Sequence, residues 1–128
     1  IKTEEIRYVD MSYLLKLTKS NPILMSEIIT VYLKQTPSLV STMRKSFSDK
    51  NWDLLGATVH KMIPSFAIMG INSEITEVAM KIQEFARELE LSQDLDKLIL
   101  QLENVCTQAC VELELELLNL NTPENENR

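Results

Sequence analysis

The sequence predicts an all-α fold: an antiparallel, up-and-down four-helix bundle preceded by one short N-terminal helix. Apolar residues recur at the three- and four-residue spacing of amphipathic helices along most of the chain. Two glycines and four prolines in 128 residues leave little material for turns, so the elements should be long. The breaks between the periodic segments span only a few residues, and short connections favour antiparallel helix neighbours.

The chain has the length of one domain with a single hydrophobic core. We expect residues 1–9 to be a polar lead or linker, residues 10–120 to form the bundle, and residues 121–128 to be a frayed polar tail. The first residue is isoleucine rather than methionine, which favours excision from a longer parent protein.

The first two helices are predicted from their caps. Asp10 and Ser12 can each cap a short segment over Met11–Leu17. Asn21 is a favoured N-cap and Pro22 suits the first helical position, so a second helix should run from there to about Phe47. Pro37 should bend this helix rather than break it. Its expected apolar stripe comprises Leu24, Ile28, Val31, Tyr32, Leu39, Met43 and Phe47.

Three further helices follow, with Asn51, Asn72-Ser73 and Ser92 as start signals and Gly70 as the stop of the third. The residues expected to face the core are Leu55, Val59, Met62, Phe66 and Met69 in the third helix, Ile75, Val78, Ala79, Ile82, Phe85 and Leu89 in the fourth, and Leu95, Leu98, Ile99, Leu102, Val105 and Ala109 in the fifth.

The end of the fifth helix has a conflicting pattern, because glutamate alternates with leucine or valine over Val111–Leu118. Such alternation is typical of a strand. We nevertheless predict a helix, because no second strand exists to pair with it and both Glu and Leu are good helix formers.

Charge and composition exclude several functions. The formal net charge is −6 and no basic cluster occurs, so neither nucleic acid nor an anionic membrane surface is an expected partner. No apolar run approaches the roughly 20 residues of a membrane span, and no signal peptide is recognisable, which favours a cytoplasmic domain. Cys106 and Cys110 have no further Cys or His nearby in sequence to complete a four-ligand site, so we expect core thiols and neither a metal nor a cofactor.

His60, the single histidine, lies within the predicted third helix. At about 100° per residue, Leu55, Met62 and Met69 lie on the opposite side, so the imidazole should reach solvent. The residues within about 40° of His60 are Asp53, Gly56, Pro64, Ala67 and Ile71.

Several residues near His60 have short side chains, and two of them, Gly56 and Pro64, lower the stability of the helix. A mid-helix glycine such as Gly56 costs about 1 kcal/mol relative to alanine, and a proline such as Pro64 about 3 kcal/mol. Two explanations remain open. The small residues could give clearance for a partner's active site to approach the ring, or the helix could bend to fit the bundle with Gly56 incidental.

The segment Ala57-Thr58-Val59-His60-Lys61-Met62-Ile63-Pro64-Ser65-Phe66-Ala67-Ile68-Met69-Gly70 resembles the motif of histidine-containing phosphotransfer (HPt) domains. That motif is a helix with His, Lys and small residues that ends in Gly ten positions after the His. Tyr32–Pro37 and Asp49–Trp52 are similar to the family's usual approach to its histidine, so the resemblance covers roughly residues 10–85. It implies a four-helix bundle with a short leading helix.

The resemblance further implies that His60 accepts a phosphoryl group, through Nε2, from a phospho-aspartate of a response-regulator receiver domain and passes it to another receiver. The domain would have no ATP site, metal or cofactor of its own, and its receivers could belong to the same parent chain, such as a membrane-bound hybrid sensor kinase. The roles implied for the remaining residues are phosphate support by Lys61, a docking face of Gly56, Ala57, Ile63, Pro64 and Ala67, and structural roles for Phe66 and Gly70.

The chain departs from the family at two positions. The family usually has Lys three positions after the His and Gly four after, where this chain has Ile63 and Pro64. Lys61 would have to substitute for the lysine.

Two other functions compete with this interpretation. The chain could be a plain helical interaction module, in which the leucine-rich fifth helix pairs with another protein and Glu112, Glu114 and Glu116 form its solvated face. Alternatively, His60 could be the general base of an enzyme, but Asp53, the acidic neighbour on its face, lies two helical turns away.

Overall fold

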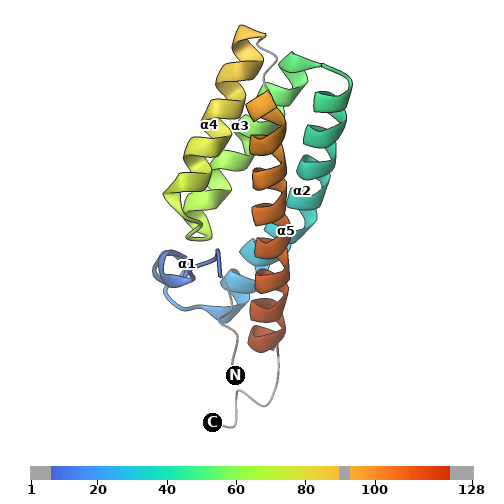
Figure 1. The fold of residues 1–128 in the computed structure, drawn as a ribbon. Helices are drawn as coiled ribbons and strands as arrows, with labels where there is room; N and C mark the ends of the chain where they lie inside the picture. The colour runs from blue at the N-terminus through green and yellow to red at the C-terminus, as the bar shows by residue number, and fades with distance from the viewer. Residues whose placement is uncertain (1–6, 90–92, 122–128) are drawn as a thin grey trace, which may run out of the picture.

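The computed structural model describes residues 7–89 and 93–121, and these form five helices with no strand (Figure 1). The helices are α1 (Ser12–Thr18), α2 (Pro22–Ser48), α3 (Trp52–Ile68), α4 (Ser73–Glu88) and α5 (Gln93–Asn121). The predicted all-α class is confirmed. The first six residues, the predicted cap Ser92 and the tail beyond Asn121 lie outside the described residues.

Three helices begin at the predicted asparagines. The side-chain oxygen of Asn21 accepts hydrogen bonds from the amides of Ile23 and Leu24, at 2.9 and 3.1 Å. Asn51 accepts from Leu54 at 3.2 Å in the same way, and Asn72 accepts from Glu74 at 2.7 Å. Each asparagine thereby satisfies amides that have no acceptor within the helix.

The start of α1 differs slightly from the prediction. Met11 occupies the N-cap position and makes no side-chain cap bond, while Asp10 accepts a hydrogen bond from the Ser12 amide at 2.9 Å. Ser12 is therefore the first helical residue rather than a cap. The helix covers Ser12–Thr18 instead of Met11–Leu17.

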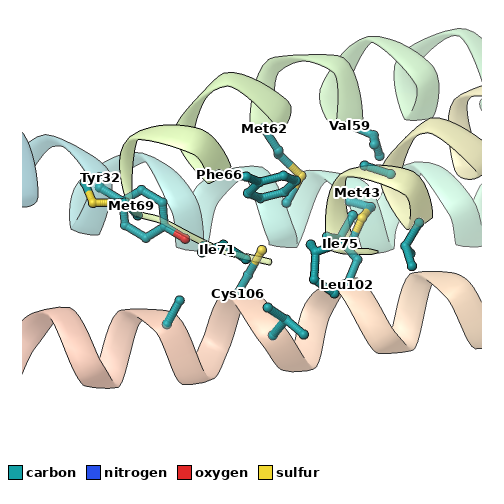
Figure 2. Packing of buried hydrophobic residues seen from close by; sticks show 14 of the residues in the cluster. Tyr32, Met43, Val59, Met62, Phe66, Met69, Ile71, Ile75, Leu102 and Cys106 are labelled. Carbon is teal, nitrogen blue, oxygen red and sulfur yellow. The ribbon is translucent and has the colours of Figure 1, made fainter. Parts of the chain in front are cut away.

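The helices pack as a bundle in which α3 lies between α2 and α4, while α5 contacts α2 and α4 (Figure 1). The short helix α1 lies at one end and contacts α2 and α3. Figure 2 shows the centre of the core, where Val59, Met62 and Phe66 of α3 lie above Leu102 and Cys106 of α5. Both α2 and α3 continue as single helices through their internal prolines, Pro37 and Pro64.

The predicted core stripe is right for α3 and partly wrong for α2 and α4. All five residues predicted for α3 are buried. In α2, Val31 is 51% exposed and Leu24 is also exposed, because the buried side runs through Met25 and Ile29 instead. The first turns of α2 are apolar on several sides, so hydrophobicity alone does not determine which side faces the core. Leu89 is exposed because α4 has already ended at Glu88 and Leu89 is its left-handed C-cap.

Residues Val111–Leu118 are helical, as predicted, and form part of α5. The expectation that Glu112 is solvated is wrong, because only 5% of this residue is exposed. Its carboxylate accepts hydrogen bonds from the backbone amides of Tyr8 and Val9 at 3.0–3.1 Å, and Arg7 lies 3.7 Å away. Glu112 thus fastens the segment before α1 to α5.

The same segment is also joined to the turn between α3 and α4. The Asp10 amide donates to the Met69 carbonyl at 3.0 Å, and Val9 is buried in the core. Gly70 has a φ of +67°, and a Cβ at this position would collide with the Asp10 carbonyl oxygen. A glycine is therefore required here for both backbone conformation and space.

Within the described part of the chain, no helix is both long and apolar enough to cross a membrane.

Candidate functional site around His60

His60 is exposed on α3, as the helical wheel predicted. Leu55, Val59 and Met62 on the inner side of α3 are almost fully buried, so the imidazole lies on the face directed away from the core. Ile71 does not share that face, contrary to the wheel. The helix ends at Ile68, and the turn at Gly70 directs Ile71 into the core, where it is buried.

The residues predicted as a docking face fall into two groups. Ala57, Pro64 and Ala67 are exposed like His60, whereas Gly56 and Ile63 are half-buried. Ile63 packs against the core, so the position at which the family usually has a lysine is occupied here by a partly buried apolar side chain. Of the two remaining predicted positions, Lys61 is exposed and Phe66 is buried in the core.

Packing does not explain the glycine at position 56. A Cβ built at Gly56 would lie 3.6 Å from the Cβ of Ala86 in α4, which is ordinary van der Waals contact. Alanine would therefore fit between the two helices, and it would favour the helix by about 1 kcal/mol. Gly56 leaves unfilled space beside His60 that the bundle does not require.

Gln83 of α4 is the residue that touches the imidazole. Its amide nitrogen lies 3.2 Å from Nδ1 of His60, so this ring nitrogen has a partner. Gln83 contacts Nδ1 and not the other ring nitrogen, Nε2. The wheel for α3 could not identify Gln83, which belongs to another helix.

The contact between His60 and Gln83 couples the imidazole tautomer to the orientation of the carboxamide. A carboxamide has a donor nitrogen and an acceptor oxygen, and neutral imidazole has one ring nitrogen of each kind. When the amide NH₂ donates to Nδ1, the ring proton is on Nε2. When the carboxamide is turned by half a rotation, its oxygen accepts from a protonated Nδ1, and Nε2 then has the free lone pair.

A small cleft of about 220 Å³ lies beside this contact, between α3 and α4. It is lined by Trp52, Asp53, Gly56, Gln83, Ala86 and Arg87. Arg87 is exposed in the last turn of α4, one turn after Gln83. The cleft therefore brings Arg87 together with Gln83, the residue that contacts His60, and the sequence analysis missed both.

The register of the turn could have predicted both missed residues. His60 lies 11 residues before Ile71, and Gln83 lies 12 residues after Ile71. The two are therefore almost equally far along the sequence from the α3–α4 turn. The same relation joins Gly56 with Ala86 and Arg87. In two helices joined by a tight turn, such residues face each other.

Other parts of the described chain do not add to this site. No group of three or more His, Cys, Asp or Glu side chains in residues 7–89 and 93–121 could hold a metal ion. A surface hollow of about 1150 Å³ lies between the Arg7–Met11 segment, the start of α4 and the middle of α5. Neither His60 nor Gln83 lines it.

Comparisons with protein-family models, with curated proteins and with solved structures found no match for this chain. Functional inference therefore depends on the side chains around His60.

Proposed function

We propose that this chain is an HPt domain, an antiparallel four-helix bundle that relays a phosphoryl group between receiver domains through His60. One observation supports the proposal most strongly. The single histidine is exposed among small side chains, and Gln83 contacts its Nδ1 rather than its Nε2. This arrangement suits a nucleophile that must enter the active site of another protein.

The proposed reaction requires no cofactor in this chain. The lone pair of Nε2 attacks the phosphorus of a receiver's aspartyl phosphate, an N–P bond forms, and the bond from phosphorus to the aspartate oxygen breaks. The aspartate leaves as a carboxylate. In the second transfer, an aspartate carboxylate of another receiver attacks the same phosphorus, the N–P bond breaks and the imidazole leaves. Positioning and charge stabilisation dominate such transfers, and the receiver's metal and acidic residues supply much of both.

Gln83 would set the reactive tautomer. Attack through Nε2 requires the proton on Nδ1, and this proton needs an acceptor because the ring becomes positively charged when the N–P bond forms. The oxygen of the Gln83 carboxamide, turned toward Nδ1, would accept it. Gln83 would thereby hold the ring in place and stabilise the phosphorylated state.

Positive charge near the phosphoryl group would come from Arg87 or Lys61. Ile63 cannot supply it. Lys61 is adjacent to His60 in sequence but lies about 100° around the helix. Arg87 shares the cleft with Gln83 and Gly56. A guanidinium group can donate two parallel hydrogen bonds to two oxygens of one phosphate. We therefore assign the larger role to Arg87.

The receiver would dock over Ala57, Pro64 and Ala67, whose short side chains leave the imidazole as the protruding group. On the side of the cleft, the missing side chain of Gly56 would leave more room for the receiver to approach His60. This assignment favours clearance for a partner as the reason for the small residues, since packing against α4 does not demand Gly56.

The test is phosphorylation of the purified chain by a panel of phosphorylated receivers. We expect transfer of label to His60 by at least one receiver, with the acid lability of a phosphoramidate bond. His60→Gln should fold normally and remain unlabelled. Labelling of the His60→Gln variant to the wild-type level would contradict the proposal.

A second candidate function, a helical interaction module, is favoured by the end of α5. Leu115 and Leu118 are 58% and 63% exposed there, and together with Val111 and Leu33 they line a groove of about 490 Å³. If this is the main function, Leu115→Glu should abolish self-association measured by sedimentation, and no receiver should label the wild-type chain.

A further inference from the structure

The outward face of α5 carries a row of exposed side chains, called the α5 row below. Its members follow one another at intervals of three or four residues, which places them on one side of the helix. The four large apolar members are 46–63% exposed. The row consists of Leu100, Asn104, Thr107, Val111, Leu115 and Leu118. Such a row is the surface that a second helix would cover.

Two hollows border the α5 row on the side of α2. One, of about 540 Å³, is lined by Arg44 and Val111, and the other, of about 490 Å³, is lined by Val111, Glu114 and Leu118. Val111 lines both, so the two hollows form one trough along the row. Arg44 lies toward one end of the trough and Glu114 toward the other, so the ends carry opposite charges.

The spacing of the α5 row matches itself when the row is reversed. Leu100 precedes Thr107 by seven residues, and Val111 precedes Leu118 by seven. In an antiparallel pair of α5 helices that cross at the level of Ala109, Leu118 of one copy therefore faces Leu100 of the other. Val111 faces Thr107 in the same way. A twofold axis relates the two copies, so each contact occurs twice.

The same register brings the opposite charges together. It places Glu114 of one copy at the level of Asn104 in the other, one residue from Glu103. Arg44 pairs with Glu103 at 3.2 Å and is 45% exposed, and a guanidinium group has further N–H donors for a second carboxylate. Because the twofold axis lies across the helices, the α2 side of one copy meets the α2 side of the other. Arg44 and Glu114 both lie on that side, so they face each other twice.

We infer that the α5 row and its trough are an interface between two copies of this chain, which pair through antiparallel α5 helices. A row that matches itself and charges that pair by the same symmetry favour a second copy over an unrelated helix. The inference does not depend on phosphotransfer. Because α3 and α5 lie on opposite sides of the core (Figure 2), His60 of each copy faces away from the interface and stays open to a receiver.

The first experiment is sedimentation equilibrium of the whole chain between about 1 μM and about 1 mM. We expect a reversible dimer whose share rises with concentration. Val111→Glu should weaken dimerisation by about 10²-fold or more, because it brings two carboxylates close to the twofold axis. Val31→Glu is the matched control, at a valine of α2 that is 51% exposed and lines neither hollow. A wild-type chain that stays monomeric throughout, or Val111→Glu that dimerises like the wild type, would overturn the inference.

Two charge variants test the antiparallel register. Arg44→Glu and Glu114→Arg should each dimerise about tenfold more weakly, because like charges then meet at two places. An equimolar mixture of the two should recover the wild-type dissociation constant, because both contacts in the mixed dimer join an acidic to a basic side chain. A mixture that dimerises no better than its components would rule out this pairing.

Two further controls keep these results interpretable. Urea unfolding checks that each variant is folded, and Arg44→Glu combined with Glu103→Gln replaces Arg44→Glu if the two carboxylates unfold the domain. His60→Gln should dimerise like the wild type, so the dimer and the proposed phosphotransfer fail or hold separately. Loss of the dimer in His60→Gln would contradict the assignment of the interface to α5.

Discussion

The amide nitrogen of Gln83 lies 3.2 Å from Nδ1 of His60 and joins α4 to the exposed ring on α3. This contact gives the histidine a defined orientation even though it lies on the outer face of the bundle. Removing the amide while keeping the helix should therefore separate the effect of positioning from that of fold stability.

Gln83→Ala should slow phosphorylation of His60 by about 10-fold to 100-fold, because the ring loses both its orientation and an acceptor for the Nδ1 proton. Gln83→Glu should recover part of the rate, since a carboxylate also accepts that proton. Rates of transfer from one fixed phosphorylated receiver provide the measurement. Gln101→Ala on α5, an exposed glutamine far from His60, is the matched control. An unchanged rate in Gln83→Ala would rule out the positioning role.

Gly56→Ala should stabilise the domain and impair the transfer. The added methyl group fits beside Ala86 and removes a mid-helix glycine, for a gain of up to about 1 kcal/mol in urea unfolding. The same methyl group narrows the cleft next to His60, so transfer from a receiver should become slower. If stability rises and the rate stays at the wild-type value, clearance is not the reason for the glycine.

Arg87→Ala should slow the transfer about tenfold, and Lys61→Ala should slow it less. The reason is that Arg87 shares the cleft with Gln83, whereas Lys61 lies around the side of α3. Arg44→Ala serves as the control, because Arg44 pairs with Glu103 on the other side of the molecule. A larger loss in Lys61→Ala than in Arg87→Ala would reverse the assignment of phosphate support.

Glu112→Gln should destabilise the domain by about 1–3 kcal/mol, because the buried carboxylate accepts two backbone amides and pairs with Arg7. Glu114→Gln, at an exposed position two residues away, should have little effect. Urea unfolding gives the energies, and hydrogen exchange at Tyr8 and Val9 reports release of the segment. Equal stability in the two variants would mean that Glu112 does not fasten it.

The features that the sequence predicted are those determined by neighbours along the chain. Asn21, Asn51 and Asn72 cap their helices with bonds to amides two or three residues away. The outward direction of His60 follows from the helical period and the strongly apolar opposite side of α3. The helical state of Val111–Leu118 follows from residue propensities and from the absence of a partner strand in the sequence.

The features that the sequence analysis missed depend on contacts between distant segments. Gln83 contacts His60, and Arg87 lines the cleft with Gly56, only because the α3–α4 turn brings equally spaced residues together. Glu112 is buried because Tyr8 and Val9 bring unpaired backbone amides to it. The alternating Glu/Leu pattern of α5 gives no information about these amides, which lie about 100 residues earlier in the chain. The buried side of α2 was ambiguous because its first turns are apolar on several sides.

The most direct test of the account is the site of phosphorylation. The chain should be incubated with a phosphorylated receiver and digested under alkaline conditions, and the phosphohistidine isomer should be assigned by ³¹P NMR. We predict phosphate on Nε2 of His60, with no label in His60→Gln. Phosphate on Nδ1, or on any residue other than His60, would contradict the account.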